Sequence, residues 1–323
     1  MPEIVTMGEA LIDLTQTAED AAHIRRYAAF PGGAPANVAV AAARLGAGTG
    51  FIGKVGLDAF GTSICQTLTD NQVDVSGLYR TGRELTTLAV VSVDAAGERS
   101  FAFYRNPGAD TQITLEEAVQ ALQAYGTRPV FLHFGSVSLT AEPARSATLG
   151  VASQAREMGI LLSYDPNYRA SLWPDQETAV ARMKEPLSLC HVLKLAEEEL
   201  ELLTGIRDLD AGSQVLWESY RIPLIVITMG AGGSFYRLGT RTGQVASRPV
   251  QVADTNGAGD TFLGALLSRL ALAGGLDGLT PESLEAGLAF ANRAAALTCT
   301  RPGAIPAMPT LAEVMSWKGE APQ

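Results

Sequence analysis

Residues Val130–Tyr164 read VFLHFGSVSLTAEPARSATLGVASQAREMGILLSY and contain the unit that decides the fold. Two short apolar runs, Val130–Phe134 and Ile160–Tyr164, flank the segment Pro143–Met158, whose apolar residues recur at three- and four-residue spacing. The runs predict buried strands, and the spacing predicts an amphipathic helix. A strand, a helix and a second strand in this order indicate parallel strands joined by a helix that covers their sheet.

The same alternation continues on both sides of this unit. Further strands are expected at Ile4–Met7, Gly50–Ile52, Val192–Leu195 and Leu224–Thr228. Further helices are expected at Ala36–Leu45, Ala59–Asn71, Glu197–Thr204, Gly257–Ala273 and Glu282–Thr298. The fold class is therefore α/β, with a mostly parallel sheet covered by helices on both faces. No internal repeat or low-complexity linker divides the chain, so we expect residues 1–323 to form a single domain.

One stretch departs from this alternation. Thr87–Val93 and Ser100–Tyr104 are predicted strands separated only by the turn-like residues 94–98, which indicates a hairpin. Further short strands are expected at Leu11–Thr15 and His23–Tyr27. Together they predict a small antiparallel sheet, built from about residues 11–30 and 85–106, that projects as a lid or a dimer surface. A hairpin at the sheet edge without a function is the alternative.

The composition excludes several classes of function. The chain has 24 Lys and Arg against 34 Asp and Glu, a net charge of -10, which argues against nucleic acid as a partner. The three cysteines, Cys65, Cys190 and Cys299, lie far apart, so neither a disulfide framework nor a zinc site is supported. No basic stretch precedes an apolar run at the start, and no segment reaches about 18 uninterrupted apolar residues. We expect a cytoplasmic protein without a membrane partner.

The segment Asp254–Asp260, DTNGAGD, opens the helix expected at Gly257–Ala273. Glycines let the unpaired amides of a helix N-terminus converge on an anion, such as a phosphoryl group in transit. Asp260 lies in the first turn, where it could align a hydroxyl and accept its proton. The helix N-terminus is expected to lower the proton affinity of Asp260. The alternative is an ordinary helix start, where the dipole alone favours an aspartate.

A second segment, Pro31–Asn37, leads into an alanine-rich helix. Small residues permit a ligand to approach the backbone closely. Asn37 can both donate and accept hydrogen bonds, and Asp13 can accept two more, which suits the adjacent hydroxyls of a sugar. The alternative is a buried helix that follows a Pro/Gly turn.

Taken together, GGAPANVAVAAARLG at residues 32–46 and DTNGAGDTFLGALL at 254–267 resemble the two signature regions of the ribokinase-like carbohydrate kinases, also called the PfkB family. The similarity covers nearly the whole chain. Within the family, the stretches at Phe103–Asp110 and Tyr164–Arg169 look most like those of fructokinases. The resemblance implies a three-layer fold with a β lid, and transfer of the γ-phosphoryl of ATP to the 6-hydroxyl of D-fructose.

The resemblance also implies roles for individual residues. Asp260 would be the catalytic base, and the amides of Gly257, Ala258 and Gly259 would form the anion hole. The implied sugar-binding positions are Asp13, Gly32, Gly33, Asn37, Phe103, Arg105 and Arg169. Arg105 would close over the sugar from the hairpin and Arg169 would reach the phosphates, although either arginine could instead serve in a structural ion pair.

For the nucleotide, the segment Thr228–Gly233 matches the T-x-G-x-x-G turn of the family. The implied nucleotide-binding positions are Lys194, Thr228, Gly230, Gly233, Gly257, Gly259 and Asn292. Glu199 matches the acid of the N-x-x-E motif, which helps to place hydrated Mg²⁺, but Ala196 stands where the family has Asn or Ser. A K⁺ site would be supplied by Asp254 and by carbonyls around Cys299–Gly303.

The residues leave alternatives open. A 2-keto-3-deoxygluconate kinase shares these signatures, and the carboxylate of its substrate would suit Arg105 or Arg169. Ribose or a nucleoside is a further alternative substrate. A protein of a different class, a catalytically silent sugar-binding regulator, could lack the base and the anion-hole glycines, which this chain retains. The expected partners are a small-molecule sugar and ATP, with a homodimer formed through the lid as a further expectation.

Overall fold

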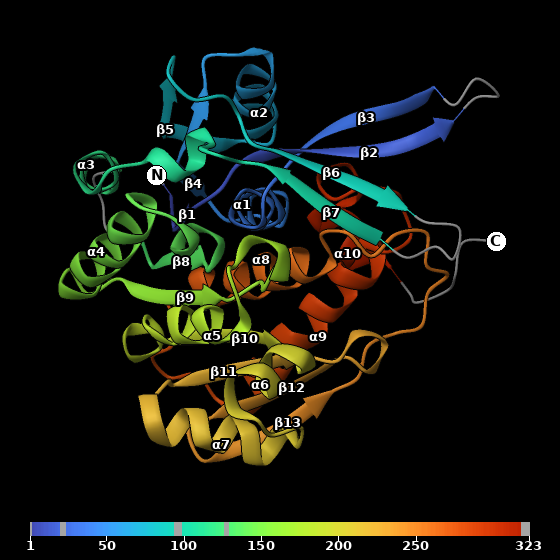
Figure 1. Ribbon diagram of the computed structural model, residues 1–323. Coiled ribbons are helices and arrows are strands. Elements are labelled where there is room, and N and C mark those ends of the chain that lie inside the picture. Colours follow the sequence, from blue (N-terminus) through green and yellow to red (C-terminus); the bar gives the residue numbers. More distant parts are fainter. Residues whose placement is uncertain (1, 20–23, 94–98, 126–128, 318–323) are drawn as a thin grey trace.

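The computed structural model describes residues 2–19, 24–93, 99–125 and 129–317. Within these residues the main sheet has nine strands in the order β13-β12-β11-β10-β9-β8-β1-β4-β5 (Figure 1). The strands are β1 (Ile4–Met7), β4 (Thr49–Gly56), β5 (Val73–Thr81), β8 (Phe131–Gly135), β9 (Leu161–Asp165), β10 (Val192–Ala196), β11 (Leu224–Thr228), β12 (Ser234–Leu238) and β13 (Arg241–Val245).

The pairing from β11 through to β5 is parallel, and only β12 and β13 add antiparallel pairs. All six expected strands of the main sheet are present, and the run expected at Gly50–Ile52 extends to Thr49–Gly56. The central strands β1, β4 and β8 are buried along their whole length, as apolar runs in a sheet covered on both faces must be. The predicted mostly parallel sheet is therefore confirmed.

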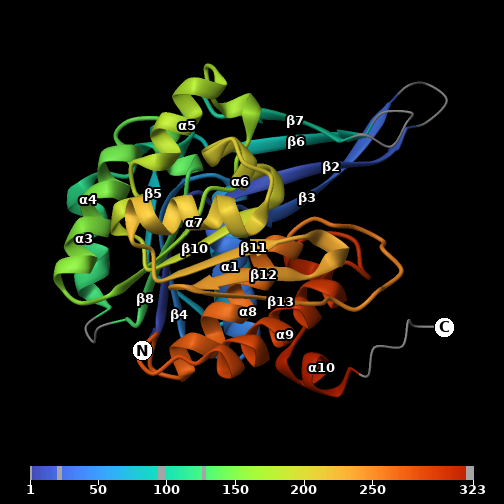
Figure 2. The ribbon, with the colours of Figure 1, turned by 90° about the horizontal axis from the view of Figure 1, so that it is seen from below.

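Helices cover both faces of this sheet. They are α1 (Ala34–Arg44), α2 (Ala59–Asp70), α3 (Leu115–Ala124), α4 (Ala144–Glu157), α5 (Gln176–Lys184), α6 (Glu197–Thr204), α7 (Leu209–Tyr220), α8 (Ala258–Leu272), α9 (Pro281–Thr298) and α10 (Leu311–Ser316). One layer of the core packs the sheet against α3 to α7, and another packs it against α1, α8 and α9 (Figure 2). The expected three layers are confirmed.

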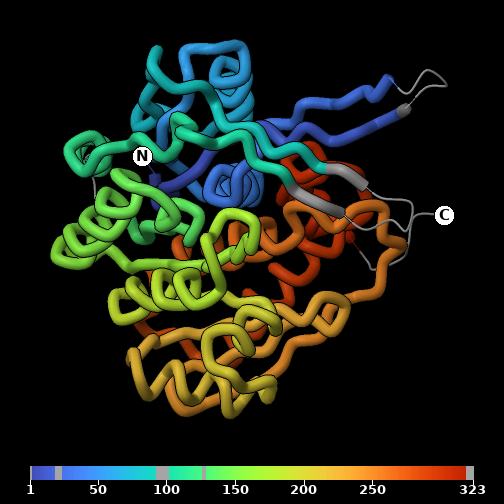
Figure 3. The backbone as a smooth tube through the Cα atoms, viewed as in Figure 1, coloured from blue at the N-terminus to red at the C-terminus, as the bar shows by residue number. Residues whose placement is uncertain are grey.

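A small sheet of four strands projects from the body. Its order is β3-β2-β6-β7, with β2 (Leu11–Glu19), β3 (Arg25–Gly32), β6 (Leu88–Val93) and β7 (Arg99–Tyr104). Both hairpins extend in the same direction, as the tube in Figure 3 shows. His23 and the turn residues 94–98 of the predicted hairpins lie outside the described residues.

The prediction of a purely antiparallel small sheet is wrong. β2 and β3 are antiparallel, as are β6 and β7, but β2 pairs with β6 in parallel. The reason is that β2 and β6 are the outgoing strands of two hairpins that leave the body side by side. Two outgoing strands that pair with each other must run in the same direction. In the described part of the chain, no helix is long and apolar enough to cross a membrane.

Candidate active site

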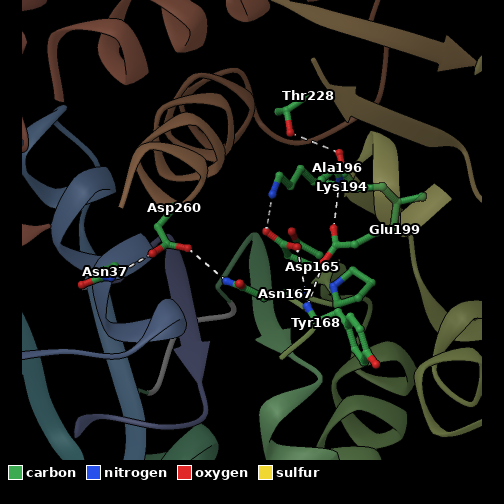
Figure 4. Close-up of polar contacts among 12 residues, drawn as sticks. Asn37, Asp165, Asn167, Tyr168, Lys194, Ala196, Glu199, Thr228 and Asp260 are labelled. Carbon is green, nitrogen blue, oxygen red and sulfur yellow. Dashed lines mark hydrogen bonds and ion pairs between the residues drawn. The ribbon is translucent and has the colours of Figure 1, made fainter. Parts of the chain in front are cut away.

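Asp260 lies in the first turn of α8, at the centre of the site. The helix is preceded by Gly257 with φ +74, and a Cβ there would lie 2.8 Å from the Cβ of Ala304, so only glycine fits this turn. The Asp260 carboxylate accepts hydrogen bonds from two amides, from Asn37 Nδ2 at 2.8 Å and from Asn167 Nδ2 at 3.2 Å (Figure 4). These two bonds connect α8 to α1 and to the segment that follows β9.

The Asp260 side chain is buried, and this burial decides its acidity. Desolvation raises its pKa, the Asn37 hydrogen bond lowers it, and nearby Asp165 raises it further. The expectation that the helix N-terminus dominates, and so lowers the proton affinity, is therefore wrong. Burial and the Asp165 charge disfavour the charged form more than the Asn37 hydrogen bond and the nearby Lys194 and Arg169 favour it. Asp260 is consequently a better proton acceptor than an exposed aspartate.

Lys194, an implied nucleotide-binding residue, lies beside this carboxylate and is not among the residues that line the second pocket described below. Its Nζ donates to Asp165 Oδ2 at 2.9 Å, and both side chains are buried. The neighbouring carboxylates outweigh desolvation and raise the pKa of Lys194, so the lysine is charged. A Cβ on Gly259 would lie 3.3 Å from the Lys194 Nζ, which places this cation next to the start of α8.

Glu199 binds two backbone amides. Its Oε1 accepts from the Tyr168 amide and its Oε2 from the Ala196 amide, both at 2.8 Å (Figure 4). Alanine at 196 cannot cap α6 with its side chain, and the Glu199 carboxylate binds the amide of that residue instead. The same carboxylate ties the segment after β9 to α6. Glu199 therefore positions the neighbouring residues Asn167 and Arg169.

The first pocket brings most of the implied sugar-binding residues together. Its walls are formed by Glu9, Leu11, Asp13, Gly33, Ala34, Asn37, Phe103, Val137, Asn167, Arg169, Asn256 and Asp260. Burial, and then the charge of Asp260, raise the pKa of Asp13 to about 6, while Arg169 lowers it. Within the described residues, Asn37 Oδ1 and Glu9 Oε2 are buried and have no hydrogen-bond partner. The pocket is therefore rich in acceptors, which suits a ligand rich in hydroxyls.

Two of the implied sugar-binding residues do not line this pocket. A Cβ on Gly32 would lie 2.8 Å from Asp13 Oδ2, so this glycine makes room for the carboxylate. Arg105 forms an ion pair of 2.7 Å with Asp110 and also donates to Thr140 Oγ1 and the Val137 carbonyl. Its guanidinium is thus engaged in the protein, which corresponds to the alternative of a structural ion pair.

A second pocket contains the implied nucleotide positions Thr228, Gly230, Gly233 and Asn292. Its walls are formed by Thr228, Gly230, Ala231, Gly233, Ser247, Arg248, Pro249, Val250, Val252, Thr255, Ala258, Gly259, Phe262, Asn292, Ala295, Ala296 and Cys299. Asn292 Nδ2 donates to Ser234 Oγ at 3.1 Å and to the Val245 carbonyl at 2.9 Å, which fixes this side chain in the wall.

The two pockets meet at the start of α8. Asn256 and Asp260 line the first pocket, whereas Thr255, Ala258 and Gly259 line the second. A group that passes from one pocket to the other must therefore pass the N-terminus of this helix. That position favours negative charge, because the helix dipole and the first amides point at it.

The oxygens expected to bind K⁺ lie near the same helix. Asp254 Oδ1 accepts from the Asn256 amide and Oδ2 accepts from the Gly303 amide, at 2.8 and 2.9 Å. The Cys299 carbonyl accepts from the amides of Ala253 and Asp254. No group of three or more His, Cys, Asp or Glu suited to a metal ion occurs in the part of the chain that the structure describes.

Glu9, Asp165 and Asn167 belong to the site but were not among the predicted residues. Asp165 ends β9 and Asn167 follows two residues later, whereas Glu9 follows β1. Polar residues directly after parallel strands are the available signal, because ligands bind at the carboxyl ends of such strands.

A hydroxyl-binding pocket and a mostly apolar pocket that meet at a helix N-terminus, beside a buried carboxylate, define a small-molecule kinase on an α/β fold. The chain belongs to the pfkB family of carbohydrate kinases, whose family model matches residues 1–311.

Individual relatives agree with this assignment. Fructokinase-1 of Oryza sativa subsp. japonica is 42% identical over 323 residues, covering 97% of this chain and 96% of that protein. The crystal structure of fructokinase from Xylella fastidiosa with bound ATP has a TM-score of 0.88 at 36% identity and covers 98% of both chains. A fructokinase double mutant from Vibrio cholerae O395, with fructose, ADP and a potassium ion bound, has a TM-score of 0.86 at 36% identity over 97% of both chains. The predicted family and ribokinase-like fold are confirmed.

Proposed function

We propose that this chain is a fructokinase, which transfers the γ-phosphoryl of ATP to the 6-hydroxyl of D-fructose. The observation that carries the proposal is Asp260, a buried carboxylate at the start of α8, where the two pockets meet. The similarity to fructokinases over nearly the full length supports fructose as the substrate.

Asp260 acts as the general base. Each carboxylate oxygen already accepts one amide hydrogen bond and keeps a lone pair for the hydroxyl of the sugar. Asn37 and Asn167 therefore orient the base without blocking it. Because burial raises its pKa, Asp260 accepts a proton more readily while remaining a modest base. In a loose phosphoryl-transfer transition state, catalysis depends mainly on the alignment of the reacting groups. The amides of Asn37 and Asn167 align the Asp260 carboxylate.

The transferred phosphoryl group is stabilised at the start of α8. The amides of Gly257, Ala258 and Gly259 supply the anion hole, with Lys194 as a nearby buried cation. The paired Asp165 keeps this lysine in place. Thr228, Gly230 and Gly233 bind the nucleotide phosphates in the second pocket, where Asn292 shapes the wall.

The sugar is held in the first pocket. Asp13 and Asn37 accept from its hydroxyls, while Gly33, Phe103 and Arg169 complete the walls. Asp13 and Phe103 belong to the small sheet, so a movement of this sheet would open or close the pocket. We assign this sheet as the lid of a single domain. Its closure would exclude water and so limit the hydrolysis of ATP.

Mg²⁺ would neutralise charge on the phosphates of ATP. Glu199 and Asp165 would hold a hydrated ion through its water ligands, because both are buried carboxylates close to the Lys194 ammonium group. Asp254 and the carbonyls of Cys299–Gly303 are hard oxygen donors of the kind that K⁺ prefers. The potassium ion in the V. cholerae double mutant supports this second site.

A coupled assay of ATP consumption tests the proposal. Fructose, 2-keto-3-deoxygluconate, ribose, glucose and fructose 6-phosphate are compared at equal concentration. Fructose should give the highest kcat/KM. A preference of more than about tenfold for 2-keto-3-deoxygluconate would contradict it and would assign the exposed Arg169 in the pocket to a substrate carboxylate. Binding of fructose without turnover would instead indicate a silent sugar-binding protein.

The small sheet is also our proposed dimer interface, since it exposes Tyr27 and Tyr104. Sedimentation of the wild type and of Tyr104→Lys tests this assignment, with a dimer expected only for the wild type. We place the enzyme in the cytoplasm, where its unpaired cysteines stay reduced.

A further inference from the structure

Glu9 is the one acidic residue in the wall of the sugar pocket that the mechanism above does not use. It lies between β1 and β2, and only 3% of its surface is exposed. Its Oε1 accepts a hydrogen bond of 3.1 Å from the amide of Ala34, the first residue of α1. Its Oε2 is buried and has no hydrogen-bond partner within the described residues. One acceptor in the pocket wall is therefore without a donor.

The backbone around Glu9 holds this oxygen in position. A Cβ on Gly33, which has φ +105, would lie 2.4 Å from the Glu9 carbonyl oxygen. A Cβ on Gly8 would lie 2.6 Å from Cγ of Pro35. The segment around Glu9 is thus packed directly against the start of α1. The Glu9 backbone is therefore fixed against that helix start, and the bond from the Ala34 amide to Oε1 orients its side chain.

Among the residues that the structure describes, none forms an ion pair with the Glu9 carboxyl group. The positive charge of Arg105 interacts with Glu9 electrostatically. The Arg105 guanidinium itself, however, is bound to Asp110, Thr140 and Val137. Burial raises the pKa of Glu9 to about 7, Arg105 lowers it and Asp110 raises it. A buried carboxyl oxygen without a donor destabilises a protein, unless a ligand supplies the donor.

We infer that Glu9 is a specificity-determining residue, whose Oε2 accepts a hydrogen bond from a sugar hydroxyl other than the one that is phosphorylated. This inference rests on the proposed function and extends its sugar site. Asp260 receives the reacting hydroxyl, whereas Glu9 comes from a different element. With Asp13 and Asn37 Oδ1, Glu9 gives the pocket three acceptors from three segments. A ligand with several hydroxyl donors satisfies all three.

The first test is Glu9→Gln, measured by calorimetric binding of fructose without nucleotide. The glutamine amide oxygen can keep the bond to Ala34, so that its NH₂ group replaces the acceptor Oε2. The fructose Kd should rise about tenfold, the loss expected for one buried hydrogen bond, while the ATP Kd and the Tm are maintained. An unchanged fructose Kd would overturn the inference.

Glu3→Gln is the matched control. Glu3 lies just before the other end of β1, and its Oε2 accepts from the Gly48 amide at 2.8 Å. It also holds a backbone amide, but it is not part of the sugar pocket. This variant should bind fructose like the wild type. If Glu9→Gln does not fold, Glu9→Asp gives the same comparison, because it retains the charge but withdraws the oxygens by one methylene.

Deoxy analogues of fructose separate a direct contact from a structural role. The analogue without the partner hydroxyl should bind the wild type and Glu9→Gln equally, while each other analogue should lose about tenfold in the variant. Equal losses in the variant for every analogue would show that Glu9 acts only through the position of α1. A wild type that neither binds nor phosphorylates fructose would refute the proposed function itself, whatever the variants do.

Discussion

The two pockets that meet at α8 are built in different ways. The sugar pocket draws carboxylates and amides from segments scattered between Glu9 and Asp260. The nucleotide pocket is built from residues between Thr228 and Cys299, and most of them are small or apolar. One pocket presents several buried polar groups, and the other presents backbone and apolar surface.

Because of this difference, we expect the sugar pocket to discriminate among ligands and the nucleotide pocket to contribute mainly to affinity. A buried polar group that a ligand leaves unpaired is costly, so the sugar pocket can reject ligands that lack the right hydroxyls. The walls of the proposed nucleotide pocket offer mainly apolar area and glycine turns, so single side chains should contribute less there. We therefore expect substitutions in the sugar pocket to have larger and more selective effects.

The largest effect is expected at Asp260, where the two pockets join. Asp260→Asn keeps the size of the side chain but removes the proton acceptor, so kcat should fall by about 10²–10⁴. Both substrate affinities should survive because the pockets remain, although the variant can accept a hydrogen bond from only one of the two amides of Asn37 and Asn167. Coupled kinetics measure the turnover, and thermal unfolding with and without fructose checks that the variant is folded and binds sugar. Retention of more than a third of the wild-type turnover would exclude Asp260 as the base.

Asp13 gives the clearest test of the difference between the two pockets, because it lines only the sugar pocket. Asp13→Ala should raise the KM for fructose by about one to two decades, which corresponds to about 1.5–3 kcal/mol for a hydrogen bond to a charged group. The KM for ATP should stay within about twofold of the wild-type value. Asp70→Ala, at the end of α2 and outside both pockets, is the control. Equal losses for both substrates would contradict the separation of the two pockets.

Acid should weaken the sugar pocket through the same residue. Burial and then Asp260 raise the pKa of Asp13 to about 6, so Asp13 gains a proton as the pH falls through that value. The protonated group loses its charge-assisted hydrogen bonds, and fructose affinity should fall by up to about tenfold between pH 7 and pH 5. Calorimetric titration without nucleotide measures this change. The dependence should shrink in Asp13→Ala to the part contributed by Glu9, whose pKa is raised by burial to about 7, and an unaltered profile there would assign the titration to a group other than Asp13.

The smallest effect is expected in the nucleotide pocket. Asn292→Ala removes the bonds to Ser234 and Val245, and the KM for ATP should rise by only about two- to tenfold. Fructose binding should not change. Asn71→Ala also removes an internal amide, which contacts Arg44 and Thr67 away from both pockets, and should alter neither constant. A loss of more than about a hundredfold in ATP affinity would contradict the view that this pocket depends little on single polar groups.

The parallel core of the fold could be predicted because its strands are continuous apolar runs. The six predicted strands are largely buried, whereas β5 and β13 were missed at the two edges of the sheet, where exposed positions interrupt the run. Strand β12 is also buried and was also missed, because its run contains the polar residues Ser234 and Arg237. Helix α5 was missed for a related reason, since only Ala179 and Met183 of its residues are buried. Elements with little buried surface carry only a weak periodic signal.

The site could be predicted where a motif fixes the local backbone. The turn before α8 needs Gly257, so the same segment that marks the turn also marks Asp260. Asn167 was missed although it follows a predicted strand, because its bond to Asp260 joins residues 93 positions apart. Arg105 was predicted to bind the sugar but is instead paired with Asp110. A sequence does not reveal whether an arginine faces a ligand or an internal partner.

The order of strands in the main sheet has a consequence for how the protein is made. From β9 onward, each new strand of this sheet pairs with the strand synthesised just before it, out to β13 at the edge. The chain is synthesised from its N-terminus, so each of these strands can add to an edge of the sheet that has already formed. None of them has to insert between two strands that are already paired. Asp260 follows all of these strands in the chain. The sheet can thus form first, and Asp260 joins Asn37 and Asn167 only near the end of translation.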